Sequence, residues 1–102
     1  MDSGEQILNW SNKAYGIEPD AKIAAVINYE AGDVSRDFIR ISDYPECSEL
    51  YESQARVSMG DVLAMCQLLC TRKGWNFQAV YKDGCQRAID RCKEKIAGKN
   101  GF

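Results

Sequence analysis

The chain has 102 residues, of which 27% are charged, and its formal net charge at pH 7 is −2. This length fits one domain over residues 1–102, and the near-neutral balance argues against a nucleic-acid binder, because phosphate contacts need an excess of Lys and Arg. The polar first five residues do not resemble a signal peptide, and no apolar stretch is long enough to cross a membrane. We therefore expect a soluble, cytoplasmic domain that binds neither nucleic acid nor membrane.

The chain contains five cysteines and no histidine. An odd number of cysteines argues against a disulfide framework. Cys66 and Cys70 are four residues apart and Cys85 and Cys92 are seven apart, so each pair shares one face of a predicted helix. A zinc site is one interpretation, but histidine and a CxxC pair are both missing. Small buried hydrophobic side chains are the favoured interpretation.

Apolar residues recur at helical spacing through the first half of the chain. A short first helix is expected to end at Gly16, since glycine commonly follows a helix. Pro19 suits the start of a second helix over about residues 20–40. The stripe of that helix expected to face the core comprises Ile23, Val26, Ile27, Val34 and Phe38.

The second half predicts two more helices after a break at residues 42–45. One covers about residues 46–73 and stops at Gly74, and its expected inward residues are Leu50, Val57, Met65, Leu68 and Leu69. Asn76 is a good N-cap for the last helix, whose tail at 97–102 should fray. The apolar stripe of that helix comprises Phe77, Tyr81, Gly84, Ala88 and Cys92. Strand patterns are nearly absent, so we expect an all-α bundle of about four helices.

Three carboxylates fall on stripes that should face inward. Glu30 lies four residues after Val26, Asp33 follows it by three, and Asp61 lies four after Val57. Buried carboxylates are costly unless they are paired or bind a metal, so the acids of two helices are expected to meet around a cation. Oxygen ligands without histidine favour Mg²⁺, or Mn²⁺, over zinc. A solvated face, or pairing with arginine, is the alternative interpretation.

The order of these features resembles the MazG family of nucleoside triphosphate pyrophosphohydrolases. The segment Gly60-Asp61-Val62-Leu63 is similar to a segment in the family that opens an apolar helix ending in glycine. Upstream, Tyr29-Glu30-Ala31-Gly32-Asp33-Val34 resembles the family's glutamate-rich segment. The family motif ExxE, a gap, then ExxD is matched as Glu30-x-x-Asp33 and Ser58-x-x-Asp61.

The resemblance implies Mg²⁺-dependent hydrolysis of a nucleoside triphosphate to a monophosphate and pyrophosphate, by a homodimer or homotetramer. Glu30, Asp33 and Asp61 would then be the catalytic metal ligands. Arg87 and Arg91 on the last helix would contact phosphate and Trp10 would stack on the base. A solvated face for the two arginines, and core packing for Trp10, are the alternatives.

This sequence departs from the family pattern at Ser58, where a glutamate is expected. A neutral hydroxyl is a weak ligand, so we expect weaker metal binding than in the family. Three hypotheses stay open: an active hydrolase, a weak or inactive MazG-like domain that binds a nucleotide or a protein partner, and a plain helical assembly module.

Overall fold

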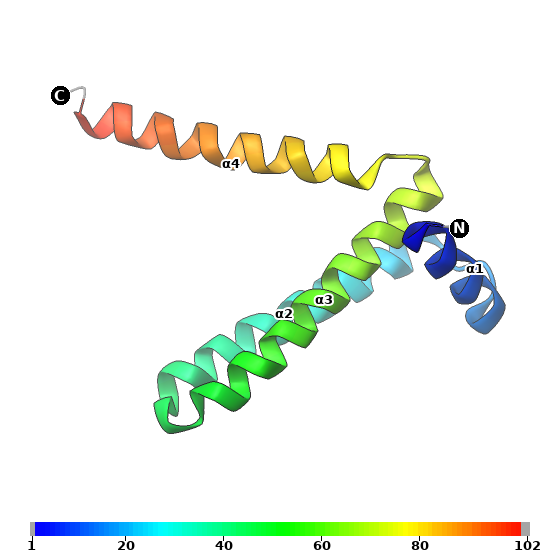
Figure 1. Cartoon of the computed structure of the whole chain (residues 1–102), viewed down its shortest axis with the longest axis horizontal. Coiled ribbons are helices and arrows are strands. Elements are labelled where there is room, and N and C mark those ends of the chain that lie inside the picture. Colours follow the sequence, from blue (N-terminus) through cyan, green and yellow to red (C-terminus); the bar gives the residue numbers. More distant parts are fainter. Residues whose placement is uncertain (1, 101–102) are drawn as a thin grey trace.

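A computed structural model describes residues 2–100, and within that range the chain consists of helices without strands (Figure 1). The expectation of an all-α chain with about four helices is confirmed. No helix within residues 2–100 is both long and apolar enough to cross a membrane. The elements in chain order are α1 (Ser3–Tyr15), α2 (Asp20–Asp43), the short 3-10 helix η1 (Pro45–Cys47), α3 (Ser48–Lys73) and α4 (Phe77–Asn100).

Helix boundaries follow local capping chemistry. The backbone N–H of Ala79 donates to the side-chain oxygen of Asn76 at 2.9 Å, which confirms the predicted N-cap of α4. Gly74 follows α3 with φ of 70°, a left-handed conformation that glycine adopts without steric cost. At its other end, α4 continues to Asn100, past the point where fraying was expected. The last two residues of the predicted tail, 101–102, lie outside the described residues.

Helices α2 and α3 form an antiparallel hairpin that is joined by η1, and the contact between them is the most extensive in the fold (Figure 1). At its open end, the Asp20 carboxylate lies 3.4 Å from Nε of Arg72 and also pairs with Lys73. The hydrogen bond from Lys73 holds the pKa of the Asp20 carboxyl below its ordinary value. Near the closed end, the guanidinium of Arg40 lies 5.8 Å from the ring centroid of Tyr51. These two contacts define how α2 and α3 are aligned.

Helix α1 crosses the hairpin near the C-terminal end of α3 (Figure 1). The crossing point is Gly4, which is buried. A Cβ atom at this position would collide with the hydroxyl oxygen of Thr71 on α3. The missing side chain therefore allows the backbones of the two helices to approach closely.

The core is small, and it coincides only in part with the predicted stripes: Ile23, Ile27 and Val34 on α2 and Met65, Leu68 and Leu69 on α3 are buried or half-buried as expected. Among residues 2–98, whose burial the structure describes, four apolar residues are buried, namely Ile23, Ala55, Leu68 and Cys70. The α2 residues turned toward α3 are Ile23, Ile27, Glu30, Val34, Asp37 and Ile41, all buried or half-buried. The prediction was wrong for four residues, which are exposed: Val26, Phe38, Leu50 and Val57. Both helices carry apolar residues on two adjacent faces, and the hairpin covers only one of them.

Helix α4 extends away from the hairpin and contacts α3 alone among the described elements (Figure 1). Phe77 at the start of its apolar stripe is half-buried, whereas the apolar residues Tyr81, Ile89 and Ile96 further along α4 are each about half exposed. The radius of gyration is 17.4 Å, against about 13 Å for a compact chain of this length. A single copy of the chain is therefore extended, and α4 packs only against α3 within the described residues.

Candidate functional site

The alignment of the hairpin brings the acids of the two long helices to the same level. Two α-helices have the same rise per residue, so in an antiparallel pair a step of one residue along the first helix corresponds to a step of one residue backwards along the second. Glu30 lies ten residues before Arg40, and Asp61 lies ten after Tyr51, the residue that Arg40 contacts. Glu30 and Asp61 are therefore level along the hairpin. By the same alignment, Asp33 is level with Ser58.

The orientations of Glu30 and Asp61 differ. Glu30 is half-buried on the seam between the helices, as predicted, and makes no hydrogen bond or ion pair with any residue in the range 2–100. Asp61 is exposed, so its predicted inward placement is wrong for the single chain. Ser58, three residues earlier, is half-buried. Neighbouring positions on a helix differ by about 100°, so an error of one position moves a side chain off the seam.

Asp33 is half-buried and already has a cationic partner. Its Oδ1 lies 3.3 Å from Nη1 of Arg36, one turn further along α2. Pairing with arginine, the alternative to a metal site, therefore holds for Asp33. No group of three or more acidic or cysteine side chains in the described part of the chain is placed to bind a metal. One chain thus does not gather Glu30, Asp33 and Asp61 into a complete metal site.

The donor chemistry nonetheless fits a hard divalent cation. Glu30 and Asp61 provide carboxylate oxygens, which are the ligands that Mg²⁺ prefers, and the chain contains no histidine. The half-buried carboxylate of Glu30, which lacks a partner within the described residues, is a group that a cation would stabilise.

The predicted phosphate-binding arginines lie on the projecting helix. Arg87 and Arg91 are exposed on α4, and Nε of Arg91 donates to the carbonyl oxygen of Arg87 at 3.4 Å. Neither forms an ion pair with Glu30, Asp33 or Asp61 within the described chain. Since α4 contacts only α3, one chain does not bring these arginines over the acids of α2.

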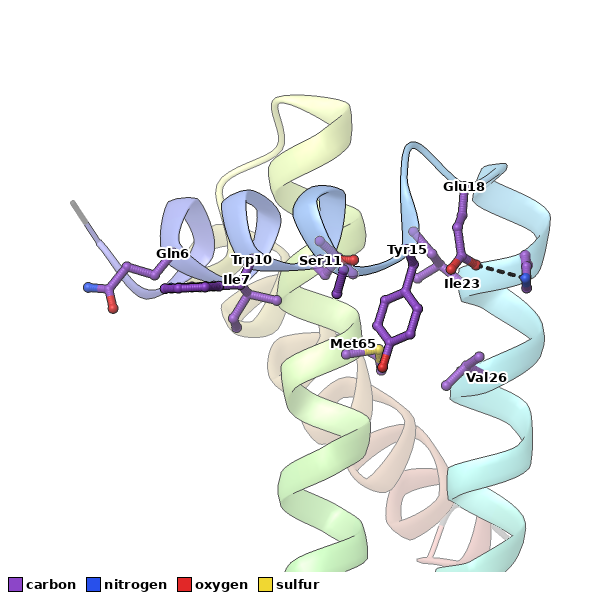
Figure 2. A pocket seen from close by; sticks show the side chains of 12 residues that line it. Gln6, Ile7, Trp10, Ser11, Tyr15, Glu18, Ile23, Val26 and Met65 are labelled. Atoms are coloured by element: carbon purple, nitrogen blue, oxygen red, sulfur yellow. Dashed lines mark ion pairs between the residues drawn. The ribbon is translucent and has the colours of Figure 1, made fainter.

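Trp10 lies at an apolar groove and not in the core, because its side chain is 68% exposed. The groove has a volume of about 780 Å³ and lies between α1 and the hairpin. Figure 2 shows Tyr15 pointing toward Met65 there, with Val26 nearby on α2. The ammonium of Lys13 lies 5.1 Å from the centroid of the Trp10 ring. Stacking of Trp10 on a base stays a prediction.

One acidic residue on the seam was missed by the sequence analysis. Asp37 is completely buried, and neither of its carboxylate oxygens has a hydrogen-bond partner. Its Oδ1 lies 3.7 Å from Nε of Arg36. The position could have been found from spacing, since Asp37 lies seven residues after Glu30 and four after Asp33, on the same face of α2.

The five cysteines are all free. Cys70 is buried, as expected for a small hydrophobic residue, and Cys47 and Cys66 are half-buried. Burial raises the pKa of the Cys66 thiol, and nearby Cys70 adds to the rise. Cys85 and Cys92 on α4 are exposed, so the expectation of burial is wrong for these two in a single chain.

Comparisons of the chain with protein-family models, with curated proteins and with solved structures find no match. The assignment of function therefore depends on the residues and their arrangement.

Proposed function

We propose that this chain is a Mg²⁺-dependent nucleoside triphosphate pyrophosphohydrolase of the MazG type, which acts as a homodimer. The observation that supports the activity is the alignment of the α2–α3 hairpin. With this alignment Glu30 is level with Asp61 and Asp33 is level with Ser58, so Glu30-x-x-Asp33 and Ser58-x-x-Asp61 run in opposite directions along the same stretch of the hairpin, which supports the proposal.

In this proposal, Glu30 and Asp61 hold the metal from two helices, and Asp33 joins them when it releases Arg36. Bound Mg²⁺ would supply neutralisation of the phosphate charge and activation of water. The half-buried position of Glu30 supports its role, because it excludes part of the surrounding water and strengthens the attraction to a cation. The exposed Asp61 is open to a ligand that approaches from solvent.

The extended shape supports the homodimer. Helix α4 presents a half-exposed apolar stripe, and the apolar groove beside Trp10 is open on the same chain. Contiguous exposed apolar surface in a protein marks an interaction site. A second copy that covered both would also bring Arg87 and Arg91 to the hairpin of its partner, where phosphate would bind.

The first prediction is that the purified protein releases pyrophosphate from at least one member of a panel of ribo- and deoxynucleoside triphosphates. The release needs Mg²⁺ or Mn²⁺ and is abolished by EDTA. Asp61→Asn and Glu30→Gln keep the side-chain size but remove the charge, so each is expected to lower kcat/KM by about a hundredfold. A coupled pyrophosphate assay measures the rate.

The matched control for this experiment is Glu52→Gln. Glu52 is also an exposed acid on α3 and lies nine residues before Asp61, nearly on the opposite side of the helix. Its activity should equal that of the wild type. Equal losses in Asp61→Asn and Glu52→Gln, or no release from any nucleotide, would contradict the proposed activity.

A second candidate function is a MazG-like domain that binds a nucleotide or a protein partner without hydrolysis. Two observations favour it: the inward position opposite Asp33 is a serine, and Asp33 is paired with Arg36. Ser58→Glu separates the two candidates, because it restores a carboxylate at the seam. If the chain is a weakened enzyme, Ser58→Glu raises Mg²⁺-dependent pyrophosphate release severalfold. If the variant binds Mg²⁺ but releases no pyrophosphate, the binding function is favoured.

A further inference from the structure

A second acidic pair lies on α2, one turn beyond the level of Glu30. Asp33 and Asp37 are four residues apart on one face, and Arg36 contacts both. Nη1 of its guanidinium lies 3.3 Å from Asp33, and Nε lies 3.7 Å from Asp37. One positively charged group therefore serves two carboxylates.

Asp37 is the member of this pair that most needs a cation. Its side chain is 0% exposed, and both carboxylate oxygens lack a hydrogen bond. A buried carboxylate that loses its counter-charge strongly destabilises the folded state, because no other interaction compensates for its lost hydration. Arg36 is the only basic residue that forms an ion pair with Asp37 in the described chain.

We propose that Asp33 and Asp37 form a cation site on α2 that the guanidinium of Arg36 fills from within the chain. A planar guanidinium carries several N–H donors and can bridge two acids, as the two contacts of Arg36 require. The Arg36 side chain is half exposed, so it can leave the site without unfolding the helix. An open cavity of about 510 Å³ adjoins the site, and it is lined both by polar residues, among them Gln54 and Ser58, and by the apolar residues Leu50 and Val57.

This site has one consequence that depends on the proposed function. Asp33 is proposed there as a metal ligand, so Arg36 competes with the divalent ion for the same carboxylate. Removing the guanidinium of Arg36 should then strengthen the binding of Mn²⁺ to Asp33, since Mn²⁺ no longer has to displace the positive charge of Arg36.

The test compares Arg36→Ala with Arg56→Ala by thermal unfolding in EDTA, followed by circular dichroism. Arg56 is an exposed arginine on α3 without an ion pair in the described chain and serves as the matched control. Arg36→Ala is expected to lower Tm by roughly 5 °C or more relative to that control, because Asp37 loses its counter-charge. Tens of millimolar methylguanidinium chloride should restore at least half of the loss in Arg36→Ala and leave the control unchanged.

The double variant Arg36→Ala with Asp37→Ala decides the outcome if Arg36→Ala does not fold. It removes both charges, so it should fold and melt near the wild-type temperature. If the double variant melts as low as Arg36→Ala or fails to fold, the cation site is refuted. It is also refuted if Arg36→Ala and Arg56→Ala melt at the same temperature, or if methylguanidinium has no effect.

Electron paramagnetic resonance of Mn²⁺ separates this inference from the proposed function. If methylguanidinium rescues Arg36→Ala but Mn²⁺ binding equals that of the wild type, the cation site is supported, and the role of Asp33 as a metal ligand fails. Tighter Mn²⁺ binding by Arg36→Ala supports both.

Discussion

Leu68→Ala is expected to lower the free energy of unfolding by about 3 kcal/mol, a value within the range for a buried leucine. Leu68 is 2% exposed and is one of the four buried apolar residues in the described part of the chain. It also lies at the base of the groove under α1, so its loss leaves a cavity where three helices meet. Small domains have a total stability of about 5 to 15 kcal/mol, so this is a large fraction.

Urea unfolding at one fixed protein concentration measures the effect, because an oligomer's stability depends on concentration. Leu63→Ala is the control, since Leu63 is on the same helix but 50% exposed. It should cost less than about 1 kcal/mol. Similar losses for the two variants would show that the core lies elsewhere on α3.

Ile89→Glu is expected to weaken the proposed homodimer by roughly a hundredfold in Kd. Ile89 is an apolar residue of α4 that lies next to Ala88 of the apolar stripe, and it is 47% exposed in the single chain. If a second copy covers this stripe, the variant buries a charge without a partner, which costs several kcal/mol, and every 1.4 kcal/mol is about tenfold in Kd. Sedimentation equilibrium should show the wild type at twice the chain mass of 11.5 kDa and the variant near that mass.

The control for this variant is Gln86→Glu, which adds the same charge to the same helix. Gln86 lies off the apolar stripe and donates to Asp90 at 3.0 Å. The control should remain dimeric. A wild type that sediments as a monomer, or equal dissociation of the two variants, would contradict the interface on α4.

The helix boundaries could be predicted because they depend on residues close in sequence. Asn76 caps α4 by a hydrogen bond to a backbone N–H three residues away, and Gly74 ends α3 by its own conformation. Both effects act within one turn of helix, so no knowledge of the rest of the chain is needed.

The candidate site was predicted only in part, because it depends on which face of each helix is covered. Glu30 was correctly placed on the seam, whereas Asp61 was not, and buried Asp37 was missed. On α3, Val57 suggested one inward face and Ala55 with Ser58 occupy the actual one. Apolar spacing permits either choice, since the two faces differ by one or two positions.

The sequence by itself determined the number of α-helices, the ends marked by Gly16, Gly74 and Asn76, and the presence of acids within the apolar pattern, since these depend on interactions within a few residues, whereas α2 continues to Asp43, past its expected end near residue 40. Only the tertiary structure decided that Arg36 pairs with both Asp33 and Asp37, that Asp61 faces solvent, and that α4 contacts α3 alone among the described elements. Those outcomes depend on how α2 and α3 are rotated and aligned against each other. That arrangement is set by contacts between distant residues, such as Asp20 with Arg72 and Arg40 with Tyr51.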